Sequence, residues 1–119
     1  MGGLPNDKKD AVTTVLKIDL QEETVEELPP MMLGRVQHSC QILELGGEEV
    51  ILVSGGTRTR PSPAVSKLAI QRDEIYYLDN KIEPKVLSSA ASLGRYQHKL
   101  LRLGDLVFAA GGKDGTAVL

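Results

Sequence analysis

The chain has 119 residues and a mass of 12.9 kDa, and its 14 Lys and Arg against 16 Asp and Glu give a net charge of −2. These values exclude a large multidomain enzyme and suit one small globular unit. Because no run of Lys or Arg exceeds two residues, we expect neither a nucleic-acid backbone nor a membrane surface as a partner.

Short β-branched or apolar runs alternate with turn residues along the chain, which predicts an all-β fold of antiparallel strands. The expected strands are, in chain order, residues 12–19, 24–28, 38–45, 50–54, 75–78, a short outer strand at Lys85 or Val86, 98–103 and 106–110. Glycines between the third and fourth strands, and between the last two, predict β-hairpins, because glycine supplies the positive φ of tight turns.

One stretch offers two strand positions, residues 65–70 and residues 75–78. We favour 75–78, because it ends in Leu78-Asp79, as the first strand ends in Ile18-Asp19. The preceding loop contains two prolines, which argues against a place inside a sheet.

A six-residue motif occurs twice, as Leu-Gly-Arg-Val-Gln-His at 33–38 and Leu-Gly-Arg-Tyr-Gln-His at 93–98, 60 residues later. Apolar runs that end in paired glycines also recur, at Gly55-Gly56 and Gly111-Gly112, and a third pair is Gly2-Gly3. The spacings between these pairs, 53 and 56 residues, predict a repeated four-stranded unit rather than a helical repeat.

The order of these features resembles the kelch repeat over almost the whole chain. The residues that carry the resemblance are Gly55, Gly56, Gly111, Gly112, Asp19, Asp79, Leu28 to Met31, Arg35, His38, Arg95 and His98. The resemblance implies that each repeat forms one four-stranded blade of a β-propeller. Kelch blades usually carry an outer-strand Trp, where this chain has Val25 and then Lys85 or Val86.

The resemblance divides the chain into the second half of one blade at 1–34, a full blade at 35–92 and the first half of a third at 93–119. Propellers close with four to eight blades, so two blades' worth of strands does not make a ring. We therefore expect a fragment, a truncated form, or a chain completed by self-assembly or by blades of a longer protein.

His38, His98 and Cys40 are the candidates for metal or nucleophilic chemistry. A zinc site usually needs four ligands, or three plus water, and the sequence offers no further Cys or His. We expect each histidine to hydrogen-bond within its own blade and Cys40 to be a buried structural residue, with no catalytic group, metal or cofactor. A lone cysteine excludes an internal disulfide, and the first ten residues lack a signal-peptide pattern, so we expect a cytoplasmic location.

A partner-binding face is expected where loops 29–35 and 89–95 meet loops 57–66 and 113–119. The candidate partner-binding residues there are Arg35, Arg58, Arg60, Arg95, Gln37 and Gln97. Arginines gathered on one face suit the carboxylate or phosphate groups of a peptide, and turn-bracing or solvated arginines are the alternative interpretation.

The resemblance implies a non-enzymatic protein-interaction module, a propeller segment that presents loops to a protein partner, as in ubiquitin-ligase adaptors or cytoskeletal binding. One alternative is part of a propeller enzyme of the kelch-like oxidase or sugar-modifying type. Its ligands or acid and base groups would come from His38, His98, Tyr76, Tyr77 and Tyr96. The other alternative is a truncated fragment without activity of its own.

Overall fold

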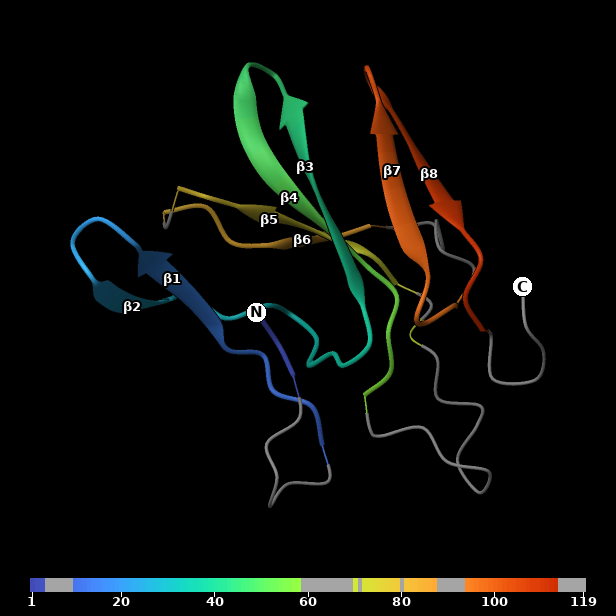
Figure 1. Ribbon diagram of the computed structural model, residues 1–119, viewed down its shortest axis with the longest axis horizontal. Coiled ribbons are helices and arrows are strands. Elements are labelled where there is room, and N and C mark those ends of the chain that lie inside the picture. The colour runs from blue at the N-terminus through green and yellow to red at the C-terminus, as the bar shows by residue number, and fades with distance from the viewer. Residues whose placement is uncertain (4–9, 59–69, 71, 80, 88–93, 114–119) are drawn as a thin grey trace.

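Figure 1 shows a computed structural model, which describes residues 1–3, 10–58, 70, 72–79, 81–87 and 94–113. The regular secondary structure in this part of the chain consists of antiparallel β-strands, which confirms the all-β class. The competing strand position at 65–69 and the candidate Arg60 lie outside the described residues.

The strands form three separate sheets of two, four and two strands. The N-terminal sheet pairs β1 (Val15–Asp19) with β2 (Thr24–Leu28). The central sheet has four strands, in the order β3 (Ser39–Leu45), β4 (Glu48–Ser54), β5 (Glu74–Tyr77) and β6 (Lys85–Val86). The C-terminal sheet pairs β7 (Lys99–Leu103) with β8 (Leu106–Ala110). The N-terminal and C-terminal sheets lie on opposite sides of the central sheet (Figure 1).

Two strands begin more than one residue away from the position that the sequence predicts. β4 begins at Glu48, because only Gly46 and Gly47 form the turn, with φ values of 58° and 83° that complete a tight two-residue connection. β1 begins at Val15 rather than at residue 12, since Val12 N donates instead to the Gly3 carbonyl.

Alternation along β4 builds two small cores, one on each side of the central sheet. Val53 packs with Val15, Met31 and Tyr76 on the side of the N-terminal sheet. Val50 and Leu52 pack with Ile75 on the other side, where Leu100 and Val107 of the C-terminal sheet cover them.

The glycine pairs join one sheet to the next. Gly3 N donates to the Arg35 carbonyl over 2.8 Å, and Gly56 N donates to the Arg95 carbonyl over 2.9 Å. A Cβ atom at Gly55, which has a φ of 63°, would overlap the Arg95 carbonyl oxygen. Glycine is therefore required where the chain leaves β4, because any side chain would push the neighbouring sheet away.

Candidate functional site

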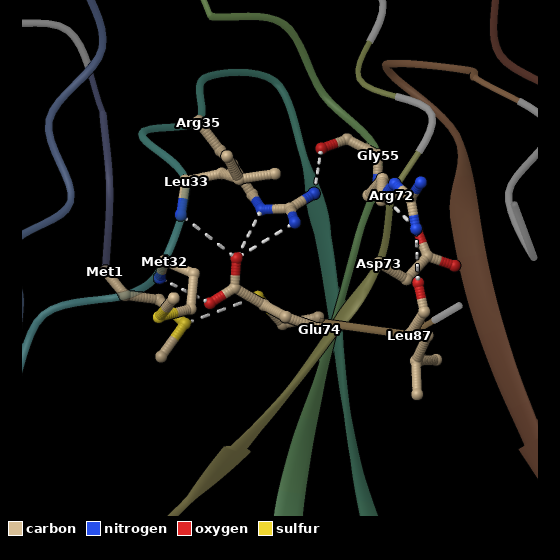
Figure 2. A network of polar contacts seen from close by, with 10 residues as sticks. Met1, Met32, Leu33, Arg35, Gly55, Arg72, Asp73, Glu74 and Leu87 are labelled. Carbon is tan, nitrogen blue, oxygen red and sulfur yellow. Dashed lines mark hydrogen bonds and ion pairs between the residues drawn. The ribbon is translucent and has the colours of Figure 1, made fainter. Parts of the chain in front are cut away.

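A buried ion pair lies where β5 begins, beside the loop that leads into β3 (Figure 2). Arg35 Nη2 and Nε donate to Glu74 Oε2 over 2.9 and 3.3 Å, and both side chains are fully buried. The third bond of the guanidinium goes from Nη1 to the Gly55 carbonyl over 2.8 Å. This arrangement uses the planar donor fork that distinguishes arginine from lysine.

The Glu74 carboxylate also fixes the loop backbone. Met32 N donates to Oε1 over 2.9 Å, and Leu33 N donates to Oε2 over 3.3 Å. One side chain thus satisfies two backbone donors and one guanidinium, and it joins the end of the N-terminal unit to the central sheet.

Arg35 is therefore fully buried, and the prediction that it contacts a partner is wrong. Arg95, its counterpart in the repeat, is half-buried and donates from Nη1 to the Gly111 carbonyl over 3.1 Å. Both arginines bind the carbonyl of the first glycine in a pair, so they brace the turn that follows β4 or β8.

The two histidines lie between sheets. His98 Nε2 of the C-terminal sheet's leading segment is 3.0 Å from Ser54 Oγ of the central sheet, so the expectation of a bond within one blade is corrected to a bond between neighbouring sheets. The Nδ1 atoms of His38 and His98 are buried and have no hydrogen-bond partner. Burial, followed by the positive charge of Arg35, lowers the pKa of His38 to about 4, and burial lowers the pKa of His98.

These shifts predict that the fold loses stability in mild acid. Burial holds the pKa of both histidines below the value near 6.5 that they regain on unfolding, so below that pH the unfolded chain binds more protons than the folded chain. We expect the free energy of unfolding to fall by about 2 kcal/mol from pH 7 to pH 4.5 through His38. Urea titrations at the two pH values measure it, and the His38→Gln variant should lose most of the difference; an equal pH dependence in the variant would contradict the assignment.

Cys40 is exposed, which corrects its expected place in the core. It lies on β3, on the face toward the N-terminal sheet, and that sheet has no described strand opposite β3 to cover it. Its Sγ is 3.8 Å from Met1 Sδ. Among the described residues, no three His, Cys, Asp or Glu side chains gather in a way that could hold a metal ion.

The other described candidates, Arg58, Gln37 and Gln97, follow β4 or precede β3 and β7, and these strand ends lie at the same end of the sheets (Figure 1). Gln37 and Gln97 are exposed and both adopt left-handed backbone, with φ values of 57° and 56°. Gln97 N donates to the Gln37 carbonyl over 2.9 Å, which fixes the two turns side by side. A non-glycine residue at such a φ is strained, so the surrounding structure must hold both turns in place.

Arg58 is the one candidate arginine that is exposed in the described part of the chain. It lies beside a cavity of about 390 Å³ that is lined by Asp10, Ala11, Thr13, Met32, Gly34 and Arg58. Its own carbonyl accepts a hydrogen bond from Ala11 N over 2.7 Å, which anchors the backbone while the side chain extends to the surface.

Sequence reasoning missed the acidic residues that organise this end. Asp73 Oδ1 accepts a hydrogen bond from Gly55 N over 3.0 Å, next to the buried Glu74. Tyr76 Oη donates to the Pro29 carbonyl over 2.7 Å and fixes the same loop. The available signal was a pair of acids directly before an apolar run, which is typical of a surface turn and so concealed their burial.

Neither the comparison with protein-family models nor the search of curated proteins finds a match for this chain. Within the described ranges, the chain contains no helix with the length and apolar character to cross a bilayer.

Proposed function

We propose that the chain is a non-enzymatic protein-interaction segment of a kelch-type β-propeller, and that it binds an acidic segment of a partner protein at the end where β3 and β7 begin. The four-stranded central sheet between two two-stranded sheets supports this proposal, as does the recurrence of the same glycine and arginine contacts from sheet to sheet.

The observation that carries the proposal is the contrast among the arginines. Arg35 and Arg95 are used to brace glycine turns, whereas Arg58 is exposed at the edge of a cavity. An exposed guanidinium beside a cavity offers bidentate hydrogen bonds to a carboxylate. The exposed amides of Gln37 and Gln97 would add neutral donors and acceptors at the same end.

A titration followed by ¹⁵N NMR tests this function, with an acidic decapeptide of alternating Glu and Gly as the probe. We expect shifts at Arg58, Gln37 and Gln97, and a fivefold or greater loss of affinity in the Arg58→Ala variant, which corresponds to about 1 kcal/mol. The control is Lys81→Ala, because Lys81 is exposed on the connection between β5 and β6. Shifts confined to lysines elsewhere, or equal affinities for the two variants, would contradict the proposal.

A further inference from the structure

The two outer sheets each expose an apolar face. On the N-terminal sheet, Leu16, Ile18 and Val25 are 50%, 63% and 64% exposed. Leu16 and Ile18 lie on the face of β1 opposite to Val15, which packs inward on the central sheet, and Val25 lies opposite Ile18 on the same outer face. On the C-terminal sheet, the exposed apolar residues are Leu101, Leu103, Leu106 and Phe108. The chain exposes 7884 Å², about a quarter more than the roughly 6,300 Å² expected of a compact chain of its mass.

Each outer sheet also has an edge to which no described strand is paired. In the C-terminal sheet, the two-residue turn makes Leu103 and Leu106 a hydrogen-bonded pair, so Val107 and Ala109 direct their backbone groups away from β7. In the N-terminal sheet, Thr13 O accepts from Met31 N on the β2 side, so Leu16 directs its backbone groups toward the open edge.

The central sheet shows how two such edges pair. In β4 and β5, Val50 lies opposite Tyr77, Ile51 opposite Tyr76 and Leu52 opposite Ile75. By the sequence repeat, β8 corresponds to β4 through the glycine pairs that follow them, and β1 corresponds to β5 through Asp19 and Asp79. Both aspartates accept hydrogen bonds from the turn that follows, which supports this alignment.

We propose that β8 of one copy pairs with β1 of a second copy, forming a four-stranded sheet in the order β7, β8, β1, β2. The register of the central sheet then places Leu106 opposite Lys17 of the second copy, Val107 opposite Leu16 of the second copy, and Phe108 opposite Val15 of the second copy. Because the two edges belong to different surfaces of one chain, the contact is head-to-tail and can add further copies.

The side chains match on this alignment. Val107 packs toward the central sheet of its own copy, and Leu16 of the second copy falls on the same face. The contact of Val15 with Tyr76 in the present structure has as its repeat equivalent a contact of Ile75 with Leu16 of the second copy. The first copy thus covers Leu16 of the second copy, a side chain that is half exposed in the single chain.

The charges match as well. Glu27 lies opposite Leu16 on β2, and Lys85 lies opposite Ile75 on β6, and both are exposed. Cross-strand partners share a face, so the alignment brings Glu27 of the second copy toward Lys85. The central sheet and the second copy therefore meet with opposite charges at their outer strands.

The backbone contact at the glycine pair is exchanged like for like. Gly2 N donates to Thr14 O on the open edge of β1, and Gly3 N donates to Arg35 O. In the proposed register Ala109 of another copy lies opposite Thr14 and takes over its carbonyl, and Gly112, the repeat equivalent of Gly3, takes over the Arg35 carbonyl as Gly56 does at Arg95. The exchange replaces one backbone N–H to C=O hydrogen bond with another. Assembly therefore gains free energy from the β8 pairing and from the apolar faces that become covered.

Proline at either edge tests the proposal, because it removes a donor from the open edge without removing one from the existing hairpin. The variants are Val107→Pro on β8 and Leu16→Pro on β1. The matched control is Val25→Pro, because Val25 directs its backbone groups to the outer edge of β2, which the proposed pairing does not use. Light scattering after size exclusion measures the mass, and circular dichroism checks the strands.

We expect the full chain and the control to form species heavier than a monomer, with a mass that rises with concentration. Each edge variant alone should be a monomer. An equimolar mixture of the two should give twice the monomer mass and nothing larger, since only one open β8 edge and one open β1 edge remain. A monomeric full chain, an edge variant that still assembles, or a mixture that stays monomeric would each overturn the proposal.

A charge exchange keeps the test decisive if a proline variant loses its strands. Lys85→Glu should weaken assembly of the full chain at least fivefold, and adding Glu27→Lys in the same chain should restore it. Equal assembly of the single and double variants would overturn the proposed alignment.

Discussion

Replacing Glu74 with Gln should lower the free energy of unfolding by about 3–5 kcal/mol, because the substitution leaves the Arg35 guanidinium buried without its counter-charge. The amide also offers only one oxygen, while Met32 N and Leu33 N at present donate to two carboxylate oxygens. Such a loss approaches the whole stability of a small domain. Urea unfolding followed by circular dichroism measures it.

Glu26→Gln is the matched control, since Glu26 is exposed on β2 and the same change there should alter stability by less than about 0.5 kcal/mol. Replacing both Arg35 and Glu74 with Met should not restore stability, because two backbone donors and the Gly55 carbonyl would remain buried without partners. A Glu74→Gln loss no larger than that of the control would show that the ion pair is not structural.

Gly55→Ala should cost about 3 kcal/mol or more, through two effects that add. The φ of 63° disfavours any Cβ atom, and this Cβ would also lie 2.8 Å from His98 Cε1 and overlap the Arg95 carbonyl. The added methyl group therefore separates the central and C-terminal sheets. Loss of the contact between Ser54 and His98 should accompany it.

Gly46→Ala measures the first of these effects, the cost of the backbone conformation, by itself. Gly46 has a nearly equal φ of 58°, but a Cβ there meets nothing within 4 Å. We expect a cost of about 1–2 kcal/mol at Gly46, from conformation alone, and the difference between the two variants measures the close approach of the sheets. Chemical denaturation of both variants supplies this difference, and equal losses would contradict the role of Gly55 in joining the sheets.

Local signals predicted the strands well. Gly46, Gly47 and Gly104 marked two hairpins because a tight turn restricts which residues can occupy it. The alignment of Asp79 with Asp19 selected residues 75–78 over 65–70, and β5 is found at Glu74–Tyr77. These features depend on residues close together in the sequence, so a single chain reveals them.

Long-range burial was harder to predict. Arg35 lies in a motif that occurs twice, and it meets a buried carboxylate because Glu74 arrives from a strand 39 residues away. The sequence contains the acid but does not show which loop it will reach. Cys40 was misplaced for a similar reason, since its exposure depends on the strands of the neighbouring sheet.

The repeated bonds at Gly3 and Gly56 have a consequence for how disturbance spreads through the molecule. Among the residues that the structure describes, each sheet is coupled only to its neighbour, so stability behaves as a sum of unit terms and nearest-neighbour terms. Damage within an outer sheet leaves the other pair of sheets coupled, whereas damage within the central sheet uncouples both outer sheets together. Within the described part of the chain, a structural change in one outer sheet can thus affect the other outer sheet only through the four strands of the central sheet.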